Sequence, residues 1–590
     1  MRAHASILAV ALAAAVLAPA CGGKAVFRLS SDENNAYELG QALARRQLPA
    51  EPTPVNDAHE PRVFALTAGK PRTIVAYDLA SGNALWRTDA DVQSRIVVGG
   101  DFIVAMEGTD LVARDQARGA PRWHAHIPGQ FLGAAADHER AYVVYKTGDR
   151  SWLAAYSGTS GDRLWADDAA GALGAPAAHG GVVYVPFLSQ WLSIVDGKTG
   201  QQLTRLRSDR DQISTLRVTS QRAYYGSKRG MFELSSDSAH PTSSPPEVKV
   251  RIPEQLERTT YGRDAYDSVQ IGYTAADRAR VWWGDDGYTI HYFRFVLGFT
   301  PDGELRWAYS HPRVELVASA DTGHVVVGLA QNGDIVALEP STGAVRARKS
   351  LGTTAPVLGA TFDADGWSPS QQSEPVETVP ALVAIARDHD ARFDRVKELA
   401  VSALAKLPGP EVTTQLLDVL ADDRAPQRLK DAVVDLLVLR HDPESLPVLT
   451  AQLGVTTDFL AHTRPDALGP VAKAIAGLGG AALAPSSVTA ALAALRVHLD
   501  AASTDTDDLV LVIAAMAAIG NGAERGALDS HLLLYHSDGD LGGDASWQQA
   551  IVGALVSHGG PGERELLRQV AADPRTQHGL AEAIRDTLHD

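Results

Sequence analysis

The sequence predicts a multidomain fold, in which an all-β propeller is followed by an all-α solenoid of stacked helix pairs. Three observations lead to this prediction. The chain has 590 residues, which is too many for one compact core. A short turn motif recurs about every 40 residues through the first part of the chain, and this is the period of propeller blades. Of 37 aromatic residues only four lie beyond residue 370, where Ala and Leu dominate, as helices prefer.

The N-terminus has the pattern of an export signal. A basic start at Arg2 precedes an apolar run over residues 7–17, and small residues then lead into Cys21. The run is too short to cross a bilayer, because a transmembrane helix needs about 20 apolar residues. We therefore expect residues 1–20 to be a cleaved signal peptide and residues 21–60 to form a tether and an N-terminal segment.

Cys21 is the only cysteine of the chain, so intrachain disulfides and cysteine-based zinc sites are excluded. The run from Leu17 to Cys21 resembles the lipobox of bacterial lipoproteins, although that family prefers Leu three residues before the cysteine and Leu17 stands four before it. The resemblance implies an acylated Cys21 that anchors the chain in a membrane. We expect a bacterial envelope protein at the outer membrane, facing the periplasm. The alternative is an ordinary secretory signal with an incidental cysteine.

A turn motif repeats through residues 61–359, the predicted propeller. Its first position is often Asp or Ser, which can hydrogen-bond to the backbone two residues on, and Gly follows four residues later because a tight turn needs a positive φ. A Trp often stands four residues after the Gly, and its large ring can wedge between neighbouring sheets. The structural residues of the motif are Asp78, Gly82, Trp86, Asp115, Gly119, Trp123, Gly161, Trp165, Asp196, Gly200, Gly303, Trp307 and Gly343.

Each repeat also begins with a short apolar strand. Seven such strands predict seven blades, and eight blades result if residues 24–62 contribute further strands. One interval between leading strands is 58 residues long, from Tyr224 to Trp282, and marks an insertion over 237–275. Long loops on rigid scaffolds often contact partners, so the insertion is a candidate interaction loop, with a solvated loop of no function as the alternative.

The repeat resembles the pyrroloquinoline-quinone-like propeller repeat, best seen at Ala76, Asp78, Gly82 and Trp86. A lipobox together with such a propeller is similar to the propeller lipoproteins of the outer-membrane β-barrel assembly machinery. The resemblance covers about residues 60–350. It implies a protein-binding scaffold that assists the assembly of outer-membrane proteins, although the helical tail departs from the single-domain pattern of that family.

Residues 379–590 are predicted to be helical, after a polar linker over 360–378. Apolar residues recur at helical spacing, as at Leu429, Val433 and Leu436. Prolines stand where helices should begin or break. The pattern resembles HEAT or armadillo repeats, which stack helix pairs into a solenoid, and an irregular helix bundle is the alternative.

Two groups of side chains could suggest metal binding. His124 and His126 have the spacing of one strand face, but two imidazoles are not a metal site without further ligands, so we expect a surface pair. Asp538, Asp540 and Asp544 lie in a glycine-rich run that lacks the glutamate at the twelfth position of a calcium-binding loop. We expect a solvated interhelical loop there, and no metal at either place.

We expect neither a catalytic residue nor a cofactor. The net charge of −17 argues against nucleic acid as a partner, because phosphate binding needs clustered Lys and Arg. Quinone dehydrogenases of the same superfamily often hold their cofactor beside a disulfide, which a single cysteine cannot form. The sequence thus predicts a non-catalytic scaffold whose partners are other envelope proteins. Two alternatives are a quinone-dependent or other ligand-binding propeller, and an adaptor or sensor subunit of another envelope complex.

Overall fold

The computed structural model describes Phe27 and most of residues 60–589, which form two compact units. The first unit ends at Val376 and the second begins at Glu377. The residues outside the description are 1–26, 28–59, 189, 208–212, 214, 219–221, 228–229, 236–246, 249–278, 285–286, 313, 370–373, 423, 454–467, 501–502, 539–545 and 590.

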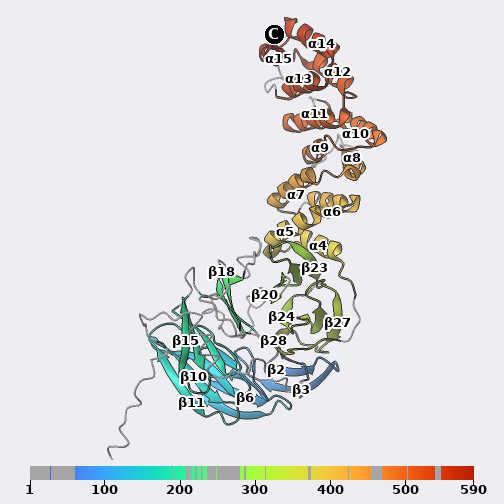
Figure 1. Cartoon of the computed structure of the whole chain (residues 1–590). Coiled ribbons are helices and arrows are strands. Elements are labelled where there is room, and N and C mark those ends of the chain that lie inside the picture. The colour runs from blue at the N-terminus through green and yellow to red at the C-terminus, as the bar shows by residue number, and fades with distance from the viewer. Residues whose placement is uncertain are drawn as a thin grey trace, which may run out of the picture. The chain divides into compact units, whose positions relative to one another are not determined.

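The described part of the first unit folds into seven four-stranded antiparallel sheets (Figure 1). Six of them are built from four consecutive strands each. The strands are, sheet by sheet, β28 (Val357–Asp363), β1 (Arg62–Thr67), β2 (Arg72–Asp78) and β3 (Asn83–Ala90); β4 (Val97–Val98), β5 (Phe102–Glu107), β6 (Asp110–Asp115) and β7 (Pro121–His126); β8 (Gln130–Ala136), β9 (Arg140–Thr147), β10 (Arg150–Ser157) and β11 (Arg163–Ala169); β12 (Ala177–His179), β13 (Val182–Phe187), β14 (Trp191–Asp196) and β15 (Gln202–Arg207); β16 (Thr215–Val218), β17 (Arg222–Ser227), β18 (Gly230–Ser235) and β19 (Glu247–Val248); β20 (Ala279–Gly284), β21 (Gly287–Tyr292), β22 (Phe295–Phe299) and β23 (Leu305–Ser310); and β24 (Leu316–Asp321), β25 (Val326–Ala330), β26 (Asp334–Leu338) and β27 (Val345–Ser350).

The sheets follow one another around a centre. The strand of each sheet that lies nearest the centre contacts the corresponding strand of a neighbouring sheet. β4 contacts β8, β8 contacts β12, and β12 contacts β16. On the other side β20 contacts β24, β24 contacts β28, and β28 contacts β4. Neighbouring sheets therefore pack face to face, as the blades of a propeller do, and the fold agrees with the predicted propeller. The predicted source of an eighth blade, residues 24–62, lies outside the description apart from Phe27 and residues 60–62.

The hydrophobic core is divided into clusters that lie between neighbouring sheets. One cluster joins Phe102 and Val104 of β5 to Val143 and Tyr145 of β9. The second strand of a sheet is covered on both faces, so β9 is buried over five successive residues. The fourth strand lies at the outer edge, and β3 accordingly alternates between exposed and half-buried residues. The alternation follows from the pleat of a strand that packs on one face only.

The first sheet takes its inner strand from the far end of the unit. β28 pairs with β1 in antiparallel register, with Ala360 opposite Ala65. This corrects the predicted boundary, because residues 360–363 belong to a strand and not to a linker, and Trp367 lies in the core beyond it. The physical reason is that β1 would otherwise present an unpaired edge at the centre of the ring.

The second unit is a stack of helix pairs (Figure 1). Successive pairs are α4–α5, α6–α7, α8–α9, α10–α11, α12–α13 and α14–α15, and the second helices of the pairs pack on one another in order from α5 to α15. This agrees with the predicted all-α region. The helices are α4 (Thr378–Ala386), α5 (Asp394–Ala405), α6 (Pro410–Leu420), α7 (Gln427–Arg440), α8 (Leu446–Leu453), α9 (Leu468–Ala476), α10 (Pro485–Val497), α11 (Thr506–Gly520), α12 (Arg525–Tyr535), α13 (Ser546–His558), α14 (Pro561–Ala572) and α15 (His578–Leu588).

Local sequence explains where these helices begin and end. Pro410, Pro485 and Pro561 each stand in the first turn of a helix, where proline's missing N–H has no partner to lose. At the other end, the Arg440 guanidinium donates to the carbonyls of Ala405, at 3.0 Å, and of Leu407, at 2.6 Å. These carbonyls lie at and beyond the end of α5, where backbone acceptors lack helical partners. Within the described ranges, no helix combines the length and the apolarity needed to cross a bilayer.

The pairing of β28 with β1 predicts which truncations the propeller survives. A chain that ends at Val376 keeps β28 and should unfold in one cooperative transition. A chain that ends at Pro356 loses the inner strand of the first sheet, and its propeller should lose cooperative unfolding, because β1 becomes an open edge. Thermal unfolding followed by circular dichroism measures both. Equal transitions in the two truncated chains would contradict the closure described here.

Candidate functional site

The repeated turns join the third and fourth strands of the sheets and share one backbone geometry. Their glycines, Gly82, Gly119, Gly161, Gly200, Gly303 and Gly343, have φ between 71° and 86°. In most copies the Gly N–H donates to the carbonyl of the first turn residue, as from Gly119 to Asp115 at 2.8 Å. In the copy at Gly303 the bond goes to Thr300 instead, at 3.0 Å. A positive φ excludes most side chains, so the backbone alone favours glycine here.

The aspartates at the first position close the turns with their side chains. The carboxylates of Asp78, Asp115 and Asp196 each accept a hydrogen bond from the backbone N–H two residues on, at 2.7 Å, 3.0 Å and 2.8 Å. Asp115 also accepts from Arg122 at 2.7 Å. The hydrogen bond from Arg122 and its positive charge hold the pKa of Asp115 below its ordinary value, although partial burial opposes this.

Each motif tryptophan reaches across to the turn of the next sheet. The indole N–H of Trp86 donates to the carbonyl of Gln116 at 2.9 Å, and that of Trp123 to Gly158 at 2.9 Å. The same bond recurs from Trp165 to Gly197 at 3.0 Å and from Trp307 to Pro340 at 2.9 Å. The motif therefore forms a seam between neighbouring sheets, which we call the tryptophan seam.

The seam gives the turn glycines a second role. A Cβ atom on Gly119 would lie 2.5 Å from the Trp86 ring, and one on Gly161 would lie 2.6 Å from the Trp123 ring. Gly343 stands in the same relation to Trp307, at 2.5 Å. The sequence predicted these glycines from the turn alone. Each of these glycines lies against a tryptophan ring of the preceding sheet, as Gly161 lies against Trp123. Sequence spacing alone does not reveal this contact.

The seam that closes the ring uses a lysine. The motif position after Gly343 holds Ala347, and Lys349 takes over by donating its ammonium to the carbonyl of Ala80 at 3.0 Å. Sequence reasoning missed Lys349, and the only signal for it was the absent tryptophan. On the neighbouring seam, Gln116 donates to the carboxylate of Asp363 at 2.5 Å and so ties β28 to the second sheet.

The propeller has two faces with different loops. We call the face with the Asp–Gly turns the turn face, and the opposite one, where hairpins join second to third strands, the hairpin face. On the hairpin face the loop before β12 contacts the β13–β14 hairpin, since Leu188 donates its N–H to Ala172 at 3.0 Å. The adjacent sheet, β8–β11, has the same arrangement. Thr147, at the β9–β10 hairpin, donates to the carbonyl of Pro128 in the loop before β8 at 2.9 Å, and β8 packs on β12.

Several buried polar groups of the propeller form structural hydrogen bonds. The hydroxyl of Tyr142 donates to Asp137 at 2.6 Å, and burial together with that carboxylate raises the pKa of Tyr142. The ring of His291 is fully buried and bonds to Ser319 at 2.9 Å and to the carbonyl of Phe293 at 2.9 Å. These side chains hold neighbouring segments of the propeller together.

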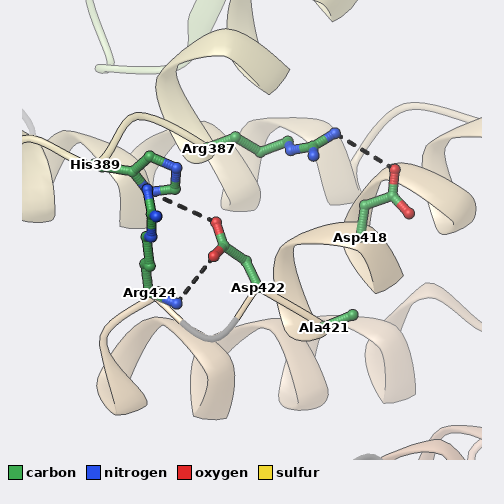
Figure 2. Close-up of a pocket in the computed structure, with 6 residues that line it drawn as sticks. All are labelled: Arg387, His389, Asp418, Ala421, Asp422 and Arg424. Carbon is green, nitrogen blue, oxygen red and sulfur yellow. Dashed lines mark hydrogen bonds and ion pairs between the residues drawn. The ribbon is translucent and has the colours of Figure 1, made fainter.

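In the helical unit an open groove of about 610 Å³ lies between the ends of the first two helix pairs. Figure 2 shows its ion pairs: Arg387 lies 3.6 Å from Asp418, and His389 lies 3.8 Å from Asp422. The Arg424 N–H donates to Asp422 at 2.9 Å. Arg387 and His389 are each about half exposed. The described lining of the groove carries charges of both signs, from Arg387 and Arg424 and from Asp418 and Asp422.

The remaining predicted residues do not form a site. His124 and His126 are exposed on β7, and His126 lies 3.1 Å from Asp110. Among the described residues, His, Cys, Asp and Glu side chains form no group that could hold a metal ion. Asp538 caps the end of α12 through its N–H. Cys21, Asp540, Asp544 and nearly all of the 237–275 insertion lie outside the described residues.

A family model described as the outer membrane protein assembly factor BamB matches residues 70–229. This segment contains the turns at Asp78, Asp115 and Asp196 with their tryptophan seams. Residues 70–229 of the first unit therefore carry PQQ-like repeats. No curated protein gives a significant sequence match to the chain.

Three solved structures resemble the chain at low identity. BamB from Moraxella catarrhalis is 15% identical over 50% of this chain and 83% of its own, with a TM-score of 0.32. The computationally designed Ika8 protein is 13% identical over 52% of this chain and 92% of its own, with a TM-score of 0.33. Hsv2 from Kluyvelomyces marxianus is 9% identical over 42% of this chain and 77% of its own, with a TM-score of 0.28. Scores of this size do not establish a relationship, so the PQQ-like assignment depends on the family match.

The tryptophan seam predicts unequal effects of two Gly→Ala substitutions. Gly148 and Gly161 both have positive φ, but a Cβ on Gly148 meets nothing within 4 Å. Both substitutions should cost about 1 kcal/mol for the backbone, and Gly161→Ala about 1–3 kcal/mol more for displacing Trp123. Urea denaturation measures the two free energies of unfolding. Equal losses would show that the ring does not constrain Gly161.

The Asp115–Arg122 pair predicts a pH-dependent contribution to stability. Because the pKa of Asp115 is lowered below 3.8 in the folded chain, its contribution is present above that pH and disappears as the pH falls through the folded-state pKa. Asp115→Asn keeps a turn acceptor but loses the ion pair, which should cost less than about 1 kcal/mol near neutral pH. The difference between the variant and the native chain should vanish in acid. Urea denaturation at several pH values measures the free energies of unfolding. A difference between the two chains that stays constant with pH would contradict the role given to the Asp115–Arg122 pair.

Proposed function

We propose that the chain is a non-catalytic lipoprotein of the bacterial cell envelope that binds other proteins as a scaffold in outer-membrane protein assembly. The observation that carries this proposal is the match of residues 70–229 to the family described as the outer membrane protein assembly factor BamB. The proposal includes a ring of seven blades closed by β28, and HEAT-like helix pairs in the second unit.

A binding role is supported by the way in which both units use their residues. The motif side chains of the propeller are engaged in turns and seams, and the buried side chains of Tyr142 and His291 in structural hydrogen bonds. Loops and hairpins are therefore the parts of the propeller whose sequence can vary with a partner. In the helical unit, stacked helix pairs provide an extended surface, which is the usual binding device of repeat proteins.

The charge of the helical unit indicates the chemistry of its partner. Residues 377–590 contain 30 acidic and 17 basic residues, so they carry most of the net charge of −17. Three large apolar side chains, Val497, Leu533 and Leu534, are exposed near the ends of α10 and α12. These ends are joined by a hydrogen bond from Tyr535 to Asp500 at 3.3 Å. A partner with a basic surface and an apolar patch would complement this region.

The proposed attachment is an acylated Cys21 that holds the chain at the outer membrane on the periplasmic side. The signal-peptide pattern before Cys21 and the absence of other cysteines support it. Two alternatives concern the same architecture. One is an adaptor or sensor subunit of another envelope complex, and the other is a quinone-dependent or other ligand-binding propeller.

Crosslinking in the native membrane tests the proposal. The native chain should crosslink to proteins of outer-membrane assembly, and Cys21→Ala should release it from the membrane, abolish acyl labelling and reduce those crosslinks. Asn34→Ala, a substitution further along the N-terminal segment, is the matched control and should change neither.

Recovery of a different set of envelope proteins would favour the adaptor or sensor. Membrane retention of Cys21→Ala would contradict the lipid anchor. Spectral titration with pyrroloquinoline quinone covers the remaining alternative, since tight binding with reduction of a dye would overturn the scaffold proposal.

A further inference from the structure

Phe27 is the single residue ahead of Glu60 that the structure describes, and it is buried in the propeller. Its side chain is 1% exposed. The ring meets that of Phe187 edge-on, with centroids 5.6 Å apart and planes at 62°. It belongs to a core cluster with Tyr142 and Leu153 of one sheet and Val183 of the next. The Phe27 side chain thus lies between the sheets β8–β11 and β12–β15.

The position of Phe187 places this contact toward the hairpin face. Phe187 is the last residue of β13 and pairs with Leu173 of the preceding loop. The Arg205 guanidinium lies 5.4 Å from the Phe187 ring centroid and 5.7 Å from that of Trp191. The site that receives Phe27 is therefore built from apolar and aromatic side chains near the base of the β13–β14 hairpin.

The chain between Cys21 and Phe27 is short. Only residues 22–26 separate the two, and a fully extended chain spans at most about 3.6 Å per residue. The Cα atom of Cys21 consequently lies within about 20 Å of the Cα atom of Phe27. Acyl chains on Cys21 would be in the bilayer, so the part of the propeller that holds Phe27 would lie close to the lipid surface.

We propose that Phe27 is a latch that holds the hairpin face of the propeller against phospholipid headgroups. The proposal rests on the acylation of Cys21 that is part of the proposed function. The hairpin face offers the side chains that such a surface favours. Lys146 and Arg150 are exposed at the β9–β10 hairpin, and Trp152 and Trp191 are partly exposed near the ends of their hairpins.

The opposite face is then left for proteins. The tryptophan seams and Asp–Gly turns lie there, away from the attached side. A short attachment fixes orientation in a way that a long flexible tether cannot, because the volume reached by a chain grows with its length. The latch thereby separates a lipid-facing side of the propeller from a partner-facing side.

Lipid-borne quenching tests the orientation. Asp149→Cys places a fluorescent label on the β9–β10 hairpin, and Lys198→Cys places the same label on the turn face. The purified acylated chain is inserted into phosphatidylethanolamine and phosphatidylglycerol vesicles that carry a nitroxide on the headgroup. Quenching should be stronger at 149 than at 198. Equal quenching, or stronger quenching at 198, would overturn the proposal.

Two changes separate the latch from the anchor. Phe27→Ala, or a long Gly/Ser insertion between Cys21 and Phe27, should abolish the difference in quenching while leaving the chain on the vesicles. Phe131→Ala, which truncates a phenylalanine of β8 outside the Phe27 cluster, is the matched control and should keep the difference. A difference that persists in Phe27→Ala would overturn the role of Phe27.

The acyl state of Cys21 is measured on the same samples by mass spectrometry of the N-terminal peptide. An unacylated peptide, with a chain that does not bind vesicles, would remove both the proposed anchor and the orientation. The latch itself is then judged in the soluble Cys21→Ala chain by hydrogen exchange. Faster exchange in β13 on adding Phe27→Ala supports the latch, and unchanged exchange overturns it.

Discussion

The pairing of β28 with β1 is the contact on which the propeller depends. Second strands such as β1, β9 and β21 are buried on both faces against neighbouring sheets, so a single sheet would expose a large apolar surface. Closure needs a strand from the end of the unit to complete the sheet that the beginning of the unit starts. Ala360 opposite Ala65 meets that need, and Gln116 with Asp363 ties the closing strand to the second sheet.

The tryptophan seam repeats one solution at successive sheets. A glycine with positive φ shapes the turn, and its missing side chain leaves room for the ring that arrives from the preceding sheet. The indole N–H satisfies a carbonyl of that turn, so an aromatic side chain is buried without an unpaired donor. Because the motif residues are committed to this packing, they mark the fold and not a binding site. A family match that rests on them therefore establishes architecture more firmly than function.

The parts of the fold that the sequence could predict are those with local causes. A turn is predicted by the residue types at Asp78, Gly82 and Trp86, and the start of a helix is predicted by prolines such as Pro485. The parts that it missed depend on residues distant in the chain. Residues 360–363, the end of β28, look like the start of a linker until β1 is known as their partner. Phe27 lies in a segment that reads as a polar tether, and its partner Phe187 follows 160 residues later.

The groove and the acidic charge of the helical unit also differ in whether the sequence could predict them. The groove at Arg387 and Asp418 is made by side chains of different helix pairs, so no sequence spacing indicates it. The acidic character of residues 377–590 is a property of composition and could be counted directly. Composition gives the sign of the charge on this unit, whereas the folded geometry gives the position of the groove. In the propeller, the seams use the turn residues for folding, and Phe27 packs against Phe187 toward the hairpin face. Substitutions in the seams should therefore act on partner binding only through stability, and those in exposed loops can act on binding directly.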